Sequence, residues 1–326
     1  MSATFPKVPR PHVDNVSAIA DFAEIECLKQ SDRNLSVIDV ASAMQLAVDE
    51  DEDEGIHRSV TDAFKELEER LRNCGPDDGR YPFSLDPRGD VLRFRGLGEC
   101  DIGLNYLYLL WATQLNMKSD RVHAGCNGTE LFEELSKEVA VRYLGGPAPS
   151  VGAVVFGTAR FGDAEDDDEL DRSSFIDAIN FLCEKMGEGY GYKAHRDSRL
   201  RAKDGKLDLV AWRSFADNRP GKLICFGQCK TGTSWERSLH DLQPKGFCVK
   251  WMEKSPSVSP VRLFFVADRL PSTNWTDRSV DAGIIFDRCR ITEHVAGSGM
   301  PLPKSLASKI GKWVHAAAKS KGVSLR

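Results

Sequence analysis

Apolar residues recur every three or four positions in three stretches of the chain, residues 59–71, 129–144 and 171–186. Because an α-helix turns once in 3.6 residues, this spacing places the apolar side chains of each stretch on one face and predicts three amphipathic helices. The third stretch is followed by Gly187, and glycine commonly ends a helix.

Short apolar runs typical of strands follow residue 190. These runs are residues 192–199, 206–215, 222–230, 261–268 and 283–286. The Asp-Gly sequence at 204–205 and the Asn-Arg-Pro-Gly sequence at 218–221 predict turns between the first three strands. A helix is expected over residues 234–252, before the fourth strand. The order of a helix, three strands, a helix and a strand predicts a mixed sheet in an α/β domain.

Composition narrows the class of protein. With 41% hydrophobic and 29% charged residues, the chain has enough apolar mass for a core, and general disorder is excluded. Residues 102–115 are the most apolar stretch, but they are fewer than the ~20 residues that a spanning helix needs, so they predict a buried helix and no membrane association. Residues 1–11 lack the apolar region of a signal peptide. The nine cysteines show no CxxC pairs, which favours reduced thiols and a cytoplasmic location.

The net charge of −5 conceals an asymmetry along the chain. Residues 1–150 hold 16 basic and 27 acidic side chains, whereas residues 190–326 hold 25 basic and 12 acidic ones. A basic segment in an acidic protein favours a polyanionic partner, with a solvated lysine-rich surface as the alternative. The same two alternatives apply to the basic end of the chain, which could be a helix that lies along DNA or a solvated helix. Its lysines are Lys304, Lys309, Lys312, Lys319 and Lys321.

Polar side chains interrupt two neighbouring apolar strands. Successive side chains of a strand alternate between faces, so Phe226, Gln228 and Lys230 point the same way. Asp208 is a lone carboxylate in the preceding apolar run, and a hairpin turning at residues 218–221 brings it beside Gln228 and Lys230. Because a buried lysine is costly without a carboxylate or phosphate partner, the three side chains are expected to form a site.

These residues suit a divalent cation and a phosphate. The Asp208 carboxylate, the Gln228 amide oxygen and the Cys229 backbone carbonyl are hard oxygen ligands of the kind that Mg²⁺ prefers. Lys230 is then expected to orient or deprotonate the attacking water and to offset charge in the transition state. The alternative is a surface hairpin in which Asp208 and Lys230 form an ordinary salt bridge.

At these positions the sequence resembles the PD-(D/E)xK, or restriction-endonuclease-like, nuclease superfamily. Asp208 matches the metal-binding aspartate of its first motif, and Gln228-Cys229-Lys230 is similar to the second motif of the Mrr-type restriction nucleases, with Gln228 as ligand and Lys230 as catalytic lysine. The resemblance covers about residues 171–268 and implies a Mg²⁺- or Mn²⁺-dependent deoxyribonuclease of bacterial restriction or anti-phage defence. It also implies a separate ATPase, helicase or sensor protein as a partner.

The sequence departs from the family pattern at two points. Gln228 is neutral where most members have a carboxylate, so the site carries one negative charge fewer. Many members also place a glutamate on the first helix, and here four carboxylates remain candidates. These are Glu134, Glu138, Asp177 and Glu184.

The sequence therefore predicts an α/β protein in two parts. Residues 1–125 form an acidic, mainly helical N-terminal module, and residues 126–326 form a restriction-endonuclease-like domain, a mixed sheet flanked by helices. The expected function is metal-dependent DNA hydrolysis in the cytoplasm. Two alternatives are a catalytically degenerate nuclease fold that binds nucleic acid or a partner, and an interaction scaffold. Whether the chain forms a homo-oligomer is left open.

Overall fold

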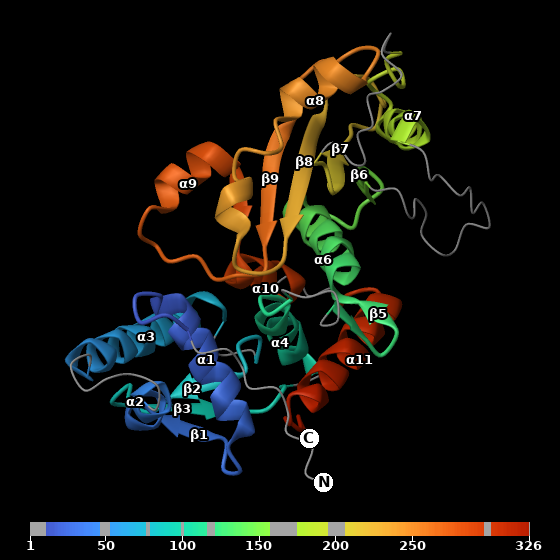
Figure 1. The fold of residues 1–326 in the computed structure, drawn as a ribbon. Coiled ribbons are helices and arrows are strands. Elements are labelled where there is room, and N and C mark those ends of the chain that lie inside the picture. The colour runs from blue at the N-terminus through green and yellow to red at the C-terminus, as the bar shows by residue number, and fades with distance from the viewer. Residues whose placement is uncertain are drawn as a thin grey trace. The chain divides into compact units, whose positions relative to one another are not determined.

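The computed structural model describes residues 11–45, 53–75, 79–98, 101–115, 121–156, 175–194, 206–296 and 301–325. The chain forms two compact units (Figure 1). Unit 1 comprises Met1–Gly128, Asp268–Thr273 and Arg288–Arg326, and unit 2 comprises Thr129–Ala267 and Asn274–Asp287. This differs from the predicted division at residue 125, because the chain returns to unit 1 twice after completing most of unit 2.

Unit 2 is built around a five-stranded sheet. Its strands are β6 (Val151–Val155), β7 (Leu209–Arg213), β8 (Leu223–Lys230), β9 (Val261–Val266) and β10 (Ile284–Phe286). Its helices are α6 (Gly128–Tyr143), α7 (Phe175–Met186), the short 3₁₀ helix η3 (Trp235–Ser238), α8 (Pro244–Trp251) and α9 (Trp275–Ala282). The strand order is β10-β9-β8-β7-β6, with β6, β7 and β8 antiparallel and β8, β9 and β10 parallel. The predicted mixed sheet in an α/β fold is confirmed.

Helices cover both faces of this sheet (Figure 1). On one face, apolar residues of α7 and α8 pack against alternate residues of β7 and β8, including Trp212 and Phe226. On the other face lies α6, whose Tyr143 ring meets Phe286 edge-on, and Phe286 in turn stacks on Phe265 of β9. The sheet is therefore buried on both sides, as strands rich in apolar residues require.

Two elements of unit 2 differ from the prediction. The expected strand at 192–199 is represented only by a bridge between Tyr192 and Met252, and residues 195–199 lie outside the described residues, as do 171–174 of the expected helix. The strand that pairs with β7 is instead β6. The expected helix over 234–252 is split into η3 and α8, because Pro244 disfavours a helical conformation at Gln243 and itself begins a new helix.

Unit 1 combines helices with a small sheet. Its helices are α1 (Val16–Lys29), α2 (Val37–Gln45), α3 (Asp53–Asn73), α4 (Gly103–Ala112), α10 (Arg288–Ala296) and α11 (Lys304–Ser320). Its strands are β1 (Asn34–Ser36), β2 (Phe83–Leu85), β3 (Val91–Phe94), β4 (Val122–His123) and β5 (Cys126–Asn127). The predicted burial of the apolar stretch at 102–115 is confirmed, since nine of the ten residues of α4 are buried. None of the described helices has the length and apolarity needed to span a membrane.

A buried ion cluster joins α1, α3 and α10 within unit 1. Asp21 accepts hydrogen bonds from Arg70 at 2.6 Å and from Arg288 at 2.7 Å, and both guanidinium groups are fully buried. Burial by itself raises the pKa of Asp21, but the two arginines outweigh it and hold that pKa below its ordinary value. Glu24 lies in the same cluster and accepts hydrogen bonds from Tyr81 and Tyr106.

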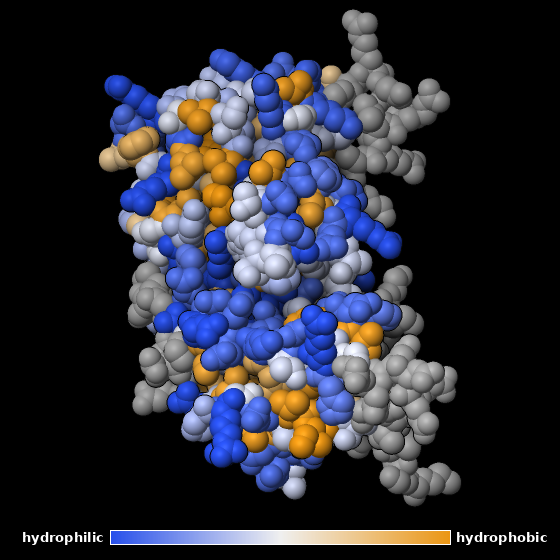
Figure 2. Space-filling model, turned by 90° about the vertical axis from the view of Figure 1, so that its left-hand side faces the viewer, coloured by the Kyte–Doolittle hydropathy of each residue, from blue (hydrophilic) through white to orange (hydrophobic). Residues whose placement is uncertain are grey.

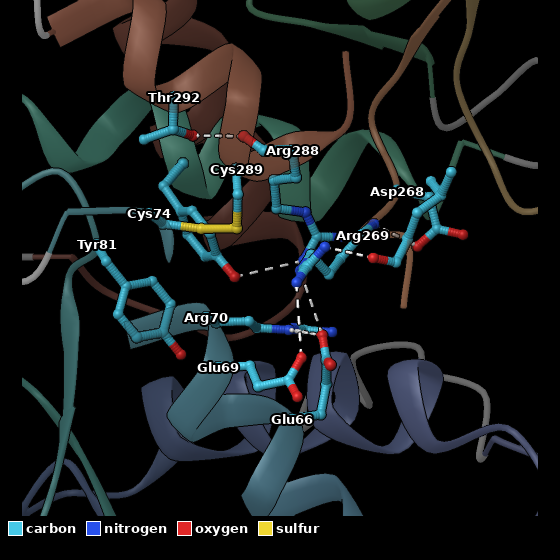
Figure 3. Close-up of a disulfide and its surroundings, with 12 residues drawn as sticks. Glu66, Glu69, Arg70, Cys74, Tyr81, Asp268, Arg269, Arg288, Cys289 and Thr292 are labelled. Carbon is cyan, nitrogen blue, oxygen red and sulfur yellow. Dashed lines mark hydrogen bonds and ion pairs between the residues drawn. A yellow bond between two sulfur atoms is a disulfide. The ribbon is translucent and has the colours of Figure 1, made fainter. Parts of the chain in front are cut away.

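A disulfide adjoins this cluster. Cys74, just after α3, is bonded to Cys289 of α10, and Figure 3 shows the bridge beside Arg70, Arg269 and Arg288. The expectation that all cysteines are reduced is therefore wrong for this pair. The other cysteines of the described residues are free thiols: Cys27, Cys126, Cys183, Cys225, Cys229 and Cys248.

Neither folded unit has the excess of basic residues that the sequence shows toward its end. Unit 1 contains 23 basic and 25 acidic residues and unit 2 contains 21 and 24, because the basic end of the chain belongs to unit 1. Figure 2 shows hydrophilic side chains over most of one face, with hydrophobic residues in separate patches. Any surface for a polyanion must therefore be a local feature rather than a whole basic domain.

Replacing Arg288 tests the ion cluster. Arg288→Ala leaves the buried Asp21 carboxylate with one guanidinium fewer, and we expect a loss of about 3–5 kcal/mol in the free energy of unfolding, measured by chemical denaturation. The matched control is Arg72→Ala, which removes an exposed i,i+4 pair with Glu68 and is expected to cost at most about 0.5 kcal/mol. Equal stability of the two variants would contradict the cluster's role.

The disulfide predicts the number of reactive thiols. Denatured protein prepared without reductant should show two fewer thiols than the same protein after reduction, and Cys74→Ser with Cys289→Ser should abolish that difference. A thiol-reagent titration measures both. The same count before and after reduction would show that the bond does not form.

Candidate active site

The site lies where β7 begins and β8 ends. β7 and β8 pair antiparallel, with Leu209 opposite Gly227 as the last pair at this end, and Asp208 directly precedes β7. The backbone N–H of Asp208 donates to the Gly227 carbonyl at 2.9 Å, and the Asp208 carbonyl accepts from Phe156 at 2.7 Å. Asp208 is therefore held by backbone bonds to the chain on both sides, although it lies just outside the strand.

The Asp208 carboxylate reaches across to β8. Its Oδ2 accepts a hydrogen bond from the backbone N–H of Cys229 at 2.6 Å. Hydrogen bonds to an ionised acceptor are among the stronger ones in proteins, so this contact holds the carboxylate against the second residue of the Gln-Cys-Lys sequence. The predicted proximity of Asp208 to that sequence agrees with this contact.

The backbone carbonyl of Cys229 points to the same side as the carboxylate. In an extended strand, the N–H and C=O of one residue face the same neighbour, and adjacent residues face opposite neighbours. The Cys229 N–H faces Asp208, whereas the carbonyl of the next residue, Lys230, accepts from Ala267 beyond β9 at 3.1 Å. The carboxylate oxygens of Asp208 and the carbonyl oxygen of Cys229 thus lie on one side of the β8 backbone.

Gln228 is fully buried, and its amide has a defined orientation. The Oε1 atom accepts from a guanidinium nitrogen of Arg262 on β9 at 3.2 Å, whereas Nε2 has no hydrogen-bond partner among the described residues. A guanidinium group only donates, so the amide oxygen faces Arg262 and the amide nitrogen points away. Arg262 also donates to the carbonyls of Asp281 and Ser238, and burial lowers its pKa.

Lys230 ends β8 and is half-buried. Strand alternation places its side chain on the face that Gln228 occupies. Within the described residues no ion pair joins Lys230 to Asp208 or to any other carboxylate, so the alternative of an ordinary Asp208–Lys230 salt bridge is not realised. The ammonium group remains in electrostatic contact with the Cys229 thiol.

Glu133 on α6 is a further carboxylate near the site, and the sequence reasoning missed it. Burial raises the pKa of the Cys229 thiol well above its usual value, the carboxylates of Asp208 and Glu133 raise it further, and Ser136 and Lys230 oppose them. Both carboxylates therefore lie within electrostatic reach of Cys229. Ser136, one helical turn after Glu133, interrupts the apolar positions 132, 135, 139 and 140 of α6, and this polar residue on the apolar side was the available sequence signal.

Three of the four carboxylates proposed from the sequence are placed less favourably than Glu133. Glu138 accepts a hydrogen bond from Arg142 at 3.0 Å within α6. Asp177 and Glu184 lie exposed on α7, and the end of that helix is joined through Lys222 to the start of β8, at the opposite end of the strand from Lys230. Glu134 is half-buried on α6, beside Glu133.

The donor set fits a hard divalent cation in part. Asp208 and the Cys229 carbonyl present oxygens on one side of β8, and Glu133 supplies a second negative charge nearby, as Mg²⁺ and Mn²⁺ favour. The oxygen of Gln228 is already bonded to Arg262, so this amide would have to leave the guanidinium group to bind a metal. No group of three His, Cys, Asp or Glu side chains suited to a metal occurs in the described part of the chain.

Comparisons of this chain with protein-family models, with curated proteins and with solved structures found no match. The functional interpretation therefore depends on the contacts around β7, β8 and α6 and on the chemistry of the residues that make them.

The bond between Gln228 and Arg262 can be tested through stability. Gln228→Leu removes an acceptor from a buried guanidinium group and should lower the free energy of unfolding by about 1–3 kcal/mol, whereas Gln228→Glu keeps an acceptor there and should avoid that loss. Chemical denaturation measures both variants. Gln243→Leu, at an exposed amide, is the control and should change little. Wild-type stability of Gln228→Leu would refute the assigned amide orientation.

Proposed function

We propose that this protein is a metal-dependent nuclease that hydrolyses DNA phosphodiester bonds. The observation that carries the proposal is the hydrogen bond from the Cys229 backbone to the Asp208 carboxylate, which brings the two proposed motifs together at the end of β8. An acid, a peptide carbonyl and a lysine that has no ion pair among the described residues, brought together by the pairing of β7 and β8, are a combination suited to phosphoryl chemistry.

Each residue has a role in this proposal. Asp208 and the Cys229 carbonyl bind Mg²⁺ or Mn²⁺, and Glu133 contributes negative charge or a further ligand. The cation, when bound, acidifies a coordinated water and offsets charge on the phosphate. Lys230 orients the attacking water and offsets charge on a phosphate oxygen. Gln228 keeps its expected role as a ligand only if its oxygen turns from Arg262.

The order of elements supports the resemblance. The PD-(D/E)xK core runs helix–strand–strand–strand–helix–strand, and unit 2 follows that order as α6, β6, β7, β8, α8 and β9, with α7 inserted after β6. Asp208 then precedes the second strand and the Gln-Cys-Lys sequence ends the third. On this reading the core begins at α6 rather than at residue 171, which makes Glu133 a first-helix carboxylate.

The wider context remains part of the proposal. The resemblance implies bacterial restriction or anti-phage defence in the cytoplasm, beside a separate ATPase, helicase or sensor protein. Unit 1 would be the natural place for such a partner to bind, since the proposed catalytic residues belong to unit 2.

A catalytically degenerate fold that binds DNA or a partner is the second candidate. It is favoured by one observation, the engagement of Gln228 with Arg262, which leaves a neutral and occupied amide where most family members have a free carboxylate. A site with fewer ligands binds a divalent cation more weakly.

Cleavage of plasmid DNA in Mg²⁺ or Mn²⁺ tests the proposal. Asp208→Ala removes the ligand that the β7–β8 pairing positions, and Lys230→Ala removes the cation beside the phosphate, so each should slow cleavage on the order of 100-fold or more. DNA binding without metal should persist in both. Glu133→Gln should weaken Mn²⁺ binding, measured by calorimetry.

Matched controls separate these effects from general changes in charge. Glu130→Gln alters an exposed carboxylate in the first turn of α6, and Lys245→Ala removes an exposed lysine of α8; both should cleave as the wild type does. If Asp208→Ala cleaves at the wild-type rate, the proposed site is wrong. If the wild type binds DNA but cleaves none with either metal, the degenerate fold is the better description.

A further inference from the structure

Helix α11 of unit 1 separates its apolar and basic residues on opposite sides. Its buried residues are Leu306, Ile310, Trp313, Val314, Ala317 and Ala318. At 3.6 residues per turn, Lys304, Lys312 and Lys319 fall within an arc of about 80° on the opposite side, with Ser308 and His315 between them. All five of these side chains are exposed. We call this set the α11 lysine face.

Helix α11 and the two elements that make most of its contacts among the described residues contain no carboxylate. The 17 residues of α11 include four lysines and no acidic residue. α11 packs against α4 and β4, and neither α4 nor the hairpin formed by β4 and β5 contains an Asp or Glu. Exposed helices commonly offset their lysines with acids one turn away, and this one does not.

The lysines are available for an external partner. Lys304, Lys312 and Lys319 form no ion pair or side-chain hydrogen bond with any residue that the structure describes. The hairpin formed by β4 and β5 lies against the opposite, apolar side of α11, where Trp313 Nε1 donates a hydrogen bond to the Arg121 carbonyl at 3.0 Å. Since unit 1 as a whole has more acidic than basic residues, this positive surface is local.

The shape of the lysine face favours an extended, regular polyanion. With a rise of about 1.5 Å per residue, the three lysines extend over ~22 Å along the axis of α11, on one side of the helix. Phosphates repeat regularly along a nucleic-acid strand, so lysines spaced along one side of a helix can contact several of them. A membrane surface is a poorer fit, because the apolar side of α11 is buried in unit 1 and has nothing to insert between lipids.

We propose that the α11 lysine face binds the phosphate backbone of double-stranded DNA. The contacts are sequence-independent and position the duplex, as lysine–phosphate contacts do. This inference shares with the proposed function only the assumption that DNA is the partner, and it requires no cleavage.

The salt dependence of DNA binding tests this surface. Binding of the full chain to a duplex is measured in EDTA, which prevents metal-dependent cleavage, across a range of salt concentrations. The logarithm of the association constant for DNA falls linearly with the logarithm of the salt concentration, and each lysine–phosphate contact adds about 0.9 to the steepness of this slope. The combined variant Lys304→Gln, Lys312→Gln and Lys319→Gln should therefore lose about 2.7 from the wild-type slope.

The control carries the same change in charge at another place. Lys245→Gln, Lys250→Gln and Lys254→Gln alter three exposed lysines of unit 2 and should leave the slope unchanged. Circular dichroism confirms that both variants fold, as expected for exposed positions.

Three results would overturn the inference: no duplex binding by the wild type, equal slopes for the wild type and the α11 variant, or equal losses in the two triple variants. Binding to vesicles rich in phosphatidylserine that requires the α11 lysines, without duplex binding, would assign the surface to membranes instead. If the protein binds DNA through the α11 lysines but does not cleave it, the result counts against the proposed nuclease alone. If it cleaves DNA but its binding does not depend on these lysines, the result counts against the α11 lysine face alone.

Discussion

One hydrogen bond organises the candidate site: the Cys229 backbone N–H donates to the Asp208 carboxylate at 2.6 Å. A strand N–H would ordinarily pair with the next strand, but β7 begins only at Leu209, and the side chain of the residue before it takes that place. This contact places the carboxylate on the side of β8 that the Cys229 carbonyl faces. The backbone bond from Asp208 to Gly227 fixes the main chain beside β8, and the contact with Cys229 fixes the carboxylate.

The protein uses its buried charges in two different ways. In unit 1, Arg70 and Arg288 are neutralised by Asp21 and Glu24 in a closed cluster, which suits a structural role. In unit 2, the acceptors of Arg262 are three neutral oxygens, those of Gln228, Ser238 and Asp281. Among the described residues no carboxylate bonds this guanidinium group directly, Asp241 and Asp281 act on it only by electrostatic attraction, and its bond to Gln228 places it beside the candidate site.

Local sequence patterns predicted the helices and strands better than they predicted which of these elements pair or pack together. The helical spacing at 129–144 corresponds to α6, and the two apolar runs joined by the turn at 218–221 correspond to β7 and β8, where Asn218 and Gly221 adopt the positive φ that such a turn needs. The partner of β7 was mispredicted, because β6 lies more than 50 residues earlier in the chain and its apolar sequence carries no mark of its neighbour. Glu133 was missed because helical periodicity shows only which face is buried, and not which end of that face meets β8.

The sequence by itself determined what depends on neighbouring residues: the amphipathic helices, the β7–β8 hairpin and hence the position of Asp208 beside Cys229. The tertiary structure decided what depends on distant ones. It paired Gln228 with Arg262, brought Glu133 toward Cys229, joined Arg288 to Asp21 across 267 positions and returned α10 and α11 to unit 1. The physical reason is that alternation and turn chemistry act within a few residues, whereas burial brings together side chains whose separation along the chain leaves no trace in the local pattern.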